Sequence, residues 1–215
     1  MIRHGFLQAG GGSARFGTDK ALVELAGKTM LQRTGALLGS VCAEISIVAP
    51  PGKYVNLPWP LIADGWPGEG PLGGILTALL HTNELVPSDK TRINDHELRS
   101  WAFIVSCDMP FLTQEFLAFL VDKASRSNAQ VVVPQSVTGL EPLCACWRTD
   151  AVAAIRTSFD SGIRKVTDAM KCLPLEVLDE SAWKRFDSDG RLFWNMNTPA
   201  DFAEARRILE TKIDE

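Results

Sequence analysis

The sequence predicts an α/β fold, a three-layer sandwich in which a mostly parallel sheet is covered by helices on both faces. Short apolar runs alternate with longer amphipathic stretches along the chain, and this alternation is typical of strands linked by helices. The run Ala102–Val105 is apolar throughout, as expected for a strand buried on both faces. The 215 residues are 46% hydrophobic and 22% charged, which is ordinary for a globular protein with one large core. We therefore expect a single domain over residues 1–215.

Two strands and two helices are expected in the first half of the chain. The apolar run Phe6–Leu7 predicts the first strand, and Ile45–Val48, which ends shortly before two prolines, predicts the second. The stretch Thr29–Leu38 carries apolar residues at helical spacing, and Leu72–Leu80 presents a leucine-rich face. Strands and helices therefore alternate from the start, as the crossovers of a parallel sheet require.

The second half is expected to continue this alternation. Trp101–Ser106 predicts a third and central strand, and Thr113–Ala124 predicts a helix with a threonine as its N-cap. Val131–Val133 predicts a further buried strand that ends at the proline after it. Thr198-Pro199 opens the last helix with a capping hydroxyl and a proline at the first helical position. The polar residues 82–99 are expected to form a long surface connection without chemistry of their own.

A glycine-rich segment after the first strand is the most informative part of the chain. Gly10, Gly11 and Gly12 are consecutive, so the backbone can turn tightly and bring its N–H groups close to a ligand. Arg15 and Lys20 follow closely, and both side chains suit phosphate. The segment predicts a cradle for a nucleoside triphosphate.

Two common phosphate-binding loops do not fit this segment. Gly12 and Gly17 have the glycine spacing of a P-loop, but Thr18-Asp19-Lys20 stands where Lys and Ser or Thr would follow. The dinucleotide-binding pattern lacks one of its glycines whether it is counted from Gly10, Gly11 or Gly12. A P-loop ATPase and a dinucleotide-dependent dehydrogenase are therefore both disfavoured.

An aspartate stands where the central strand ends. Asp108 lies in the segment Ser106–Pro110, and ligands of open α/β sheets bind beyond the carboxyl ends of the strands. Mg²⁺ takes one or two carboxylates together with phosphate oxygens. On its own, Asp108 would also fit a residue that caps a turn. With a phosphate cradle elsewhere in the chain, Asp108 is predicted to hold Mg²⁺.

Three further segments carry candidate binding residues. Asp64–Gly74 is dense in glycine and proline before a predicted helix. Its backbone can approach a flat base, and Asp64 can accept hydrogen bonds from guanine or a ribose hydroxyl. Asn195 and Asn197 stand before the last helix, whose N-terminus favours anions. Glu141 follows a loop and is expected to face an acceptor substrate. Each segment also has a plain alternative as a turn, a cap or a loop-to-strand transition.

The ordered set of motifs resembles the nucleotidyltransferases that link a nucleoside monophosphate to an acceptor phosphate. Among them it is most similar to the molybdenum cofactor guanylyltransferase family. The motifs are Ala9-Gly10-Gly11 with Arg15-Phe16-Gly17-Thr18-Asp19-Lys20, Asp64 with Gly70-Pro71-Leu72-Gly73-Gly74, Cys107-Asp108-Met109-Pro110, and Asn195-Met196-Asn197-Thr198-Pro199. They extend over nearly the whole chain. The resemblance therefore implies one nucleotidyltransferase domain over residues 1–215, of the Rossmann-like nucleotide-diphospho-sugar transferase type.

The resemblance also implies a role for each matching residue. The implied nucleotide-binding residues are Gln8, Ala9, Gly10, Gly11, Lys20, Asp64, Gly70, Pro71, Leu72 and Asp108. The implied catalytic residues are Arg15, Lys20 and Asp108, with Asp108 as the Mg²⁺ ligand. Glu141, Asn195 and Asn197 would lie near the acceptor or the metal. The terminal phosphate of the molybdenum-molybdopterin cofactor would attack the α-phosphorus of GTP and release pyrophosphate. Such transfer depends on positioning and charge stabilisation.

Other functions remain open at this stage. A sister enzyme of the same fold would transfer a cytidylyl group to the molybdenum cofactor, or a guanylyl group to another phosphorylated acceptor. A nucleotide-binding regulator would have kept the fold without the chemistry, but Lys20 and Asp108 are both present. The chain also departs from the family at Gln8, where leucine is frequent, and at Val48-Ala49-Pro50, where some members have a nucleotide-contacting asparagine.

The composition limits the partners and the compartment. The net charge of −4 gives no electrostatic reason to expect nucleic acid, and the sequence has no apolar run long enough to span a membrane. The first strand begins within a few residues of the N-terminus, which leaves no room for a signal peptide. We expect a cytoplasmic protein with GTP and the molybdopterin cofactor as partners. Cofactor-delivery or acceptor proteins are compatible with that function.

The remaining reactive side chains are expected to be structural. The five cysteines are expected to be reduced, packed thiols, because their number is odd and their spacing does not match a zinc site. His4, His81 and His96 have no partner signal and are expected on the surface or in loops. Arg148, Arg164 and Lys165 are candidates for an anionic acceptor, although each could equally be a solvated charge.

Overall fold

The computed structural model describes residues 4–10, 19–54, 57–85 and 100–211. The strands of its main sheet are β1 (His4–Gln8), β4 (Glu44–Ala49), β5 (Leu61–Ala63), β6 (Trp101–Ser106), β7 (Val131–Ser136), β8 (Gly139–Leu140), β9 (Cys144–Arg148) and β10 (Leu175–Leu178). The α-helices are α1 (Met30–Gly39), α2 (Pro71–Glu84), α3 (Gln114–Arg126), α4 (Val152–Asp160), α5 (Val166–Ala169), α6 (Glu180–Trp183) and α7 (Pro199–Thr211). None of the helices in these ranges has the length and hydropathy needed to cross a membrane.

The main sheet is mostly parallel, as the sequence predicts. Its order is β10-β7-β9-β6-β1-β4-β5, and β8 pairs with β7. The pairs β1–β4, β1–β6, β4–β5 and β7–β10 are parallel, whereas β9 runs antiparallel to both β6 and β7. The sheet is therefore mixed at β9, which the sequence analysis did not anticipate.

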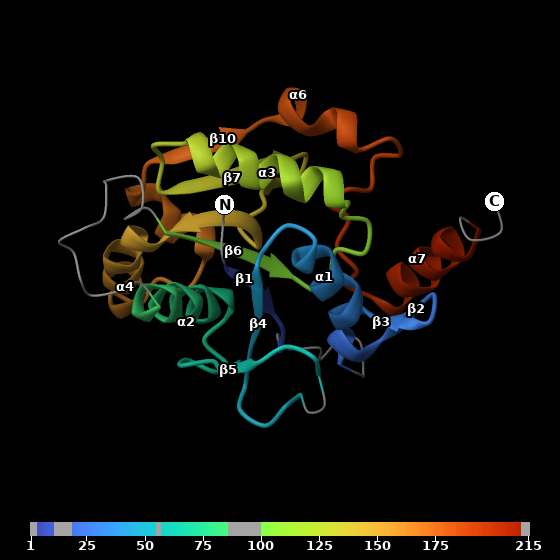
Figure 1. Cartoon of the computed structure of the whole chain (residues 1–215), viewed down its shortest axis with the longest axis horizontal. Helices are drawn as coiled ribbons and strands as arrows, with labels where there is room; N and C mark the ends of the chain where they lie inside the picture. Colours follow the sequence, from blue (N-terminus) through green and yellow to red (C-terminus); the bar gives the residue numbers. More distant parts are fainter. Residues whose placement is uncertain (1–3, 11–18, 55–56, 86–99, 212–215) are drawn as a thin grey trace.

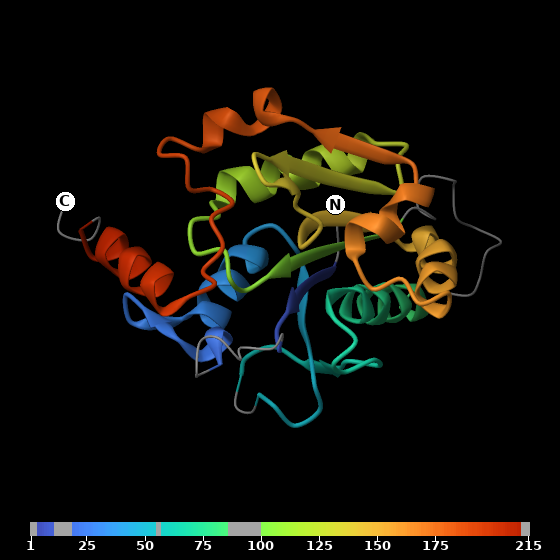
Figure 2. The same cartoon turned by 180° about the vertical axis from the view of Figure 1, so that it is seen from behind.

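Helices cover both faces of the sheet and give the predicted three layers (Figures 1 and 2). On one face the buried core gathers side chains from α1, α3 and α6, including Leu31, Phe116 and Trp183. On the other face it gathers side chains from α2, α4 and α5, including Leu76 and Ile155. Within each central strand, neighbouring residues alternate between these two cores, as the pleat requires.

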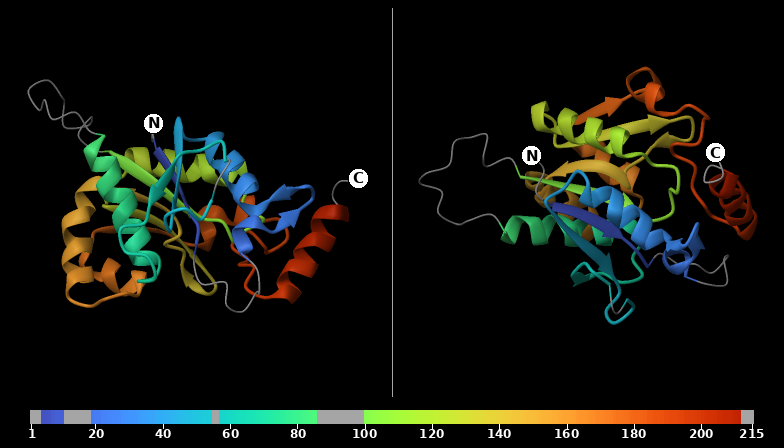
Figure 3. Two further views of the ribbon diagram at one scale, coloured as in Figure 1. Left: turned by 90° about the horizontal axis from the view of Figure 1, so that it is seen from below. Right: turned by 45° about the vertical axis from the view of Figure 1, so that its right-hand side comes forward.

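A small subdomain lies at one end of the sheet (Figure 3). The strands β2 (Glu24–Leu25) and β3 (Lys28–Thr29) form a hairpin that packs beside α7. Ala26 and Gly27 make its turn with positive φ angles of 50° and 74°, which is the geometry of a two-residue hairpin turn. No local pattern in the sequence indicates this hairpin, because alanine is uncommon at a positive φ.

The two predicted threonine caps, Thr113 and Thr198, are confirmed, and α1 has a further threonine cap that was not predicted. Thr29 Oγ1 accepts from Gln32 N, and Gln32 Oε1 accepts from Thr29 N, so α1 begins with a complete capping box. Thr113 Oγ1 accepts from Phe116 N at the start of α3. Thr198 Oγ1 accepts from Asp201 N at the start of α7. These hydrogen bonds satisfy backbone donors that the first helical turn leaves unpaired.

Two boundary expectations are wrong. β7 does not end at Pro134 but continues to Ser136. Pro134 is still in register with Leu178 of β10, but β7 has left β9 by this point, so no strand on the β9 side needs the missing N–H. The expected connection over residues 82–99 is also too long, since α2 extends to Glu84. Residues 86–99 lie outside the described ranges.

Two expectations about reactive side chains need correction. His4 is buried in β1, where its Nε2 lies 2.9 Å from Ser46 Oγ and its ring stacks on Phe6. A histidine can be buried here because Ser46 satisfies one ring nitrogen. His81 lies on α2, and His96 is outside the described residues. Four cysteines are buried free thiols as expected, but Cys172 is exposed.

Candidate active site

The topology brings the predicted site residues to one edge of the sheet. From β1 the chain builds β4 and β5 on one side and then crosses to β6 on the other. Gln8, at the end of β1, is paired with both Val48 of β4 and Ser106 of β6. The site is therefore centred where the strand order reverses, and such a point is the usual ligand crevice of an open α/β sheet.

Three predicted residues follow neighbouring strands at this edge. Ala9 N donates to Val48 O at 3.0 Å, directly after β1. Asp64 N donates to Ala49 O at 2.8 Å, directly after β5. Asp108 comes two residues after the last residue of β6. The structure thus brings together the beginning of the glycine loop, the aspartate proposed for the base and the aspartate proposed for the metal.

Gly10 must be a glycine in this arrangement. Its φ is +103°, and a Cβ built on it would lie 2.4 Å from Pro50 Cδ. Both the dihedral angle and the nearby proline exclude a side chain, so the backbone is left bare at the mouth of the site. Gly11 and Arg15, the other predicted residues of this loop, lie outside the described residues.

The side chain of Gln8 has a contact that the sequence analysis did not anticipate. Its Nε2 donates to Pro71 O at 2.9 Å, in the first turn of α2. A Cβ on Gly74 would lie 2.2 Å from the same nitrogen. Gln8 therefore holds β1 against the start of α2. The Gly70–Leu72 turn, in which Gly70 has a φ of +84°, is thereby fixed beside the end of β1.

Asp64 is half-buried and its Oδ1 stiffens the loop before α2. That oxygen accepts from Trp66 N at 2.9 Å and from Thr77 Oγ1 at 3.3 Å. Thr77 Oγ1 also accepts from Gly65 N at 3.1 Å, so α2 and the loop are tied together. Among the described residues, both hydrogen bonds to Asp64 reach Oδ1, which leaves Oδ2 as the acceptor for a ligand.

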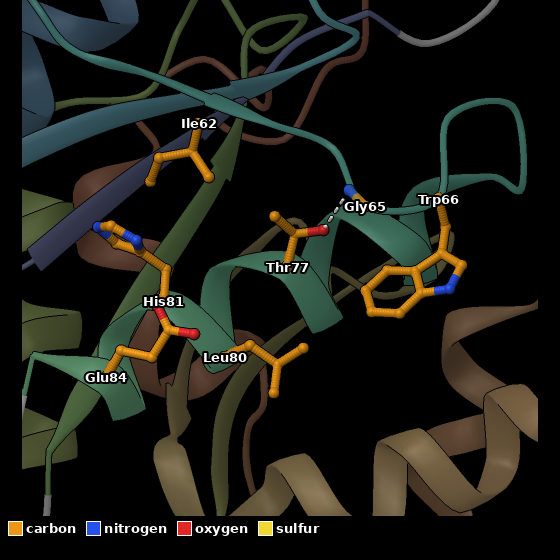
Figure 4. A pocket seen from close by; sticks show the side chains of 7 residues that line it. All are labelled: Ile62, Gly65, Trp66, Thr77, Leu80, His81 and Glu84. Atoms are coloured by element: carbon orange, nitrogen blue, oxygen red, sulfur yellow. Dashed lines mark hydrogen bonds between the residues drawn. The ribbon is translucent and has the colours of Figure 1, made fainter.

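A hollow of about 200 Å³ lies next to this loop. Figure 4 shows it between β5 and α2, with Trp66 and Thr77 at one end and His81 and Glu84 at the other. None of the predicted site residues that the structure describes lines it. Gly65 and Trp66, which follow Asp64, line the hollow, so it adjoins the candidate site but is a separate surface feature.

Asp108 is supported from two directions. Ser106 Oγ donates to its Oδ1 at 2.6 Å, which orients the carboxylate. Its backbone O accepts from Met196 N at 2.9 Å, so the segment before α7 is tied to the end of β6. Within the described ranges no cluster of three or more His, Cys, Asp or Glu is arranged for a metal. One oriented carboxylate fits Mg²⁺, which completes its shell with substrate phosphates and water.

The Lys20 side chain contacts the segment before α7. Its Nζ donates to Asn197 Oδ1 at 3.0 Å. The backbone N atoms of Asn197 and Thr198 both donate to Asp201 Oδ2, at 2.8 and 2.7 Å. The structure therefore joins two predicted motifs that lie 177 residues apart in the sequence. Asn195 lies half-buried in the same segment.

Glu141 lies beside Asp108 at the same edge. Ser106 N donates to Leu143 O at 2.7 Å, which brings the segment that carries Glu141 alongside the end of β6. Glu141 is 9% exposed, and Ser136 Oγ and Thr138 Oγ1 donate to its Oε1 at 2.6 and 3.3 Å. Burial raises the pKa of Glu141, and the nearby Asp108 charge raises it further.

The two arginine candidates for the acceptor, Arg148 and Arg164, each form an ion pair with an acidic residue. Arg148 is paired with Trp101 at the opposite end of β6 and forms an ion pair with Asp150 at 2.7 Å. The antiparallel direction of β9, which the sequence analysis missed, puts it there. Arg164 forms an ion pair with Glu69 at 2.6 Å. Arg148 is therefore remote from Asp108, whereas Arg164 lies against the residue before the Gly70–Leu72 turn.

A glycine turn, an oriented carboxylate and a lysine meet at the switch point of a mostly parallel sheet, which defines a nucleotide-binding α/β protein. Comparison with known proteins identifies its family. Residues 5–173 match the MobA-like NTP transferase domain. The chain therefore belongs to this family of nucleotidyltransferases.

Relatives match over almost the full chain. A probable molybdenum cofactor guanylyltransferase from Chloroflexus aggregans is 31% identical and covers 98% of this chain and 97% of its own. A molybdenum cofactor guanylyltransferase from Desulfosudis oleivorans is 30% identical, with coverage of 96% and 95%. The fold resembles the crystal structure of molybdopterin-guanine dinucleotide biosynthesis protein A from Archaeoglobus fulgidus, with a TM-score of 0.78, 23% identity and coverage of 97% and 99%.

Proposed function

We propose that this protein transfers GMP from GTP to the terminal phosphate of the molybdenum-molybdopterin cofactor, forming the guanine dinucleotide cofactor and pyrophosphate. The observation that carries the proposal is the convergence of Ala9-Gly10, Lys20 and Asp108 at one sheet edge. Relatives that match this chain over nearly their full length, at about 30% identity, carry the name of this activity.

The nucleotide would bind across the carboxyl ends of β1 and β5. The base would lie near Asp64 and the backbone of Gln8 and Ala9, with the Gly70–Leu72 turn beside it. The bare backbone at Gly10 would let the triphosphate approach closely. Lys20, held by Asn197, would neutralise phosphate charge. Gly11 and Arg15 would bind the same triphosphate, a role that rests on the resemblance of their motif to that of the guanylyltransferase family.

Asp108 would hold Mg²⁺, and the bound ion would supply positive charge beside the triphosphate. Ser106 keeps the Asp108 carboxylate in one orientation. Glu141 lies beside Asp108, on the side where the acceptor would approach, and Ser136 and Thr138 orient its carboxyl group. Asn195 and Asn197 would complete this side of the site.

The reaction needs no protein nucleophile. An oxygen of the acceptor's terminal phosphate forms a bond to the α-phosphorus of GTP, and the bond from that phosphorus to the β-phosphate oxygen breaks. The bond electrons leave with pyrophosphate. The residues around the site position the two substrates and stabilise the charge that builds up during transfer.

Calorimetric titration of the purified protein with GTP, CTP and ATP, each with and without Mg²⁺, tests this function. Selective binding of GTP that Mg²⁺ strengthens is expected. Preferential binding of CTP would instead favour cytidylyl transfer, an activity named for a structurally similar enzyme from Thermus thermophilus (TM-score 0.65, 15% identity). Binding of no nucleotide would contradict the proposal. A cytoplasmic location and delivery partners remain predictions from the sequence.

A further inference from the structure

A second lysine, Lys53, lies beside the turn at Gly10. Lys53 follows β4, and its backbone N donates to Pro50 O at 3.3 Å. Pro50 is the residue that crowds Gly10, and the ammonium nitrogen of Lys53 lies 3.8 Å from the point where a Gly10 Cβ would be. The positive charge therefore sits against the turn whose backbone would face the triphosphate.

The position of this ammonium group is fixed by Asp19. Lys53 Nζ lies 2.9 Å from Asp19 Oδ2, and Tyr54 Oη donates to the same oxygen at 2.9 Å. Asp19 Oδ1 accepts from Ala21 N at 3.1 Å, which caps the short 3₁₀ turn that begins at Lys20. Asp19 thus connects Lys53 to the segment that carries the predicted phosphate lysine.

These charges surround the same part of the site. Lys20, directly after Asp19, donates to Asn197 Oδ1 at 3.0 Å, and Met196 N donates to Asp108 O at 2.9 Å. The segment before α7 therefore connects the Asp19–Lys20 segment to Asp108. An unneutralised Asp19 here would repel a triphosphate. The Lys53 side chain is 32% exposed although its ammonium group is paired with Asp19.

We propose that Lys53 is a nucleotide-binding residue whose ammonium group contacts the triphosphate, with Asp19 as the residue that positions it. An ammonium group carries three donors, so one can stay on Asp19 while another reaches a phosphate oxygen. The inference rests on the proposed function only in requiring a nucleoside triphosphate. It does not depend on which base is bound.

The test separates direct contact from simple neutralisation of Asp19. GTP and guanosine binding are measured by calorimetry for wild type, Lys53→Met, Asp19→Asn and the double variant. Direct contact predicts that Lys53→Met weakens GTP binding about tenfold or more in both backgrounds, with guanosine binding changed less than twofold. Lys53→Arg should recover most of the affinity. If Lys53 only neutralised Asp19, the Lys53→Met change would have no effect once Asp19 is neutral, and that result would overturn the proposal.

The matched control is Lys171→Met. Lys171 also pairs with an aspartate, Asp168, at 2.6 Å, but both lie on the surface near α5. This variant is expected to bind GTP as wild type does. Thermal unfolding of each variant identifies any loss of fold, and Lys53→Arg keeps the proposal testable if Lys53→Met is unstable. A wild-type preference for CTP would refute guanine specificity alone, and the Lys53 test would then use CTP and cytidine. Wild type that binds no triphosphate would overturn both.

Discussion

The contact between Gln8 and Gly74 gives a prediction that can be worked from the structure. A methyl group on Gly74 would lie 2.2 Å from Gln8 Nε2 and 2.7 Å from its Cδ. The Gly74→Ala change therefore forces the glutamine side chain to move and breaks its bond to Pro71 O. Overpacking costs about 1–3 kcal/mol and the lost hydrogen bond about 1 kcal/mol, while alanine in place of glycine returns about 1 kcal/mol to α2.

The expected net destabilisation of Gly74→Ala is about 1–3 kcal/mol, the sum of these three effects. The Gln8→Ala change removes the clashing side chain, and it also removes Gln8 Oε1, a buried acceptor without a partner among the described residues. The double variant should therefore be more stable than Gly74→Ala alone, with a coupling of about 1 kcal/mol or more. Urea unfolding followed by circular dichroism measures all four proteins. Additive effects of the two changes would refute the reasoning.

Three further predictions concern the site and pH. Asp108→Ala should abolish Mg²⁺-dependent turnover with the fold intact by circular dichroism; normal turnover would rule out the metal assignment. Lys20→Ala should weaken GTP binding more than guanosine binding, and Asn197→Ala should do the same more mildly; equal losses for both ligands would contradict a phosphate role. Burial lowers the pKa of His4, so below pH about 6.5 the unfolded chain binds a proton that the folded chain resists, and stability falls towards pH 5. In urea titrations at pH 7 and 5, His4→Gln should lose less stability than wild type, and an equal loss would count against this account.

Local patterns predicted β1, α1, β4, α2, β6, α3, β7 and α7 in their order, but not β5, β8, β9, β10 or the helices α4, α5 and α6. Ala102–Val105 is apolar on both faces, and it lies in the central strand of the sheet. Thr29, Thr113 and Thr198 are N-caps whose hydrogen bonds depend only on the next three residues. Such features need no knowledge of tertiary contacts.

The antiparallel strand and the buried histidine were not predictable in this way. The direction of β9 is set by its pairing with β6 and β7. The residues Cys144–Arg148 alone do not indicate whether this pairing is parallel or antiparallel. His4 is opposite Glu44 on β4, and its ring is satisfied in the core by Ser46, two residues further along that strand. Both follow from pairing between distant segments, which local patterns do not record.

The candidate site was predictable as a set of motifs but not as a set of contacts. Sequence order separates Lys20 from Asn197 by 177 residues, and only the fold brings them to 3.0 Å. The support of Lys53 and Tyr54 for Asp19 was missed because the residues after β4 carry no recognisable motif. The Gln8 side chain ties β1 to α2 through Pro71 O, a contact that no motif indicates.

One measurement tests the central claim most directly. The wild-type protein is incubated with Mg²⁺, the molybdenum-molybdopterin cofactor and either GTP or CTP, and both pyrophosphate and the dinucleotide product are quantified. The account predicts one pyrophosphate per guanine dinucleotide cofactor formed with GTP, and little product with CTP. Product formed mainly with CTP, or pyrophosphate release without a dinucleotide product, would contradict it.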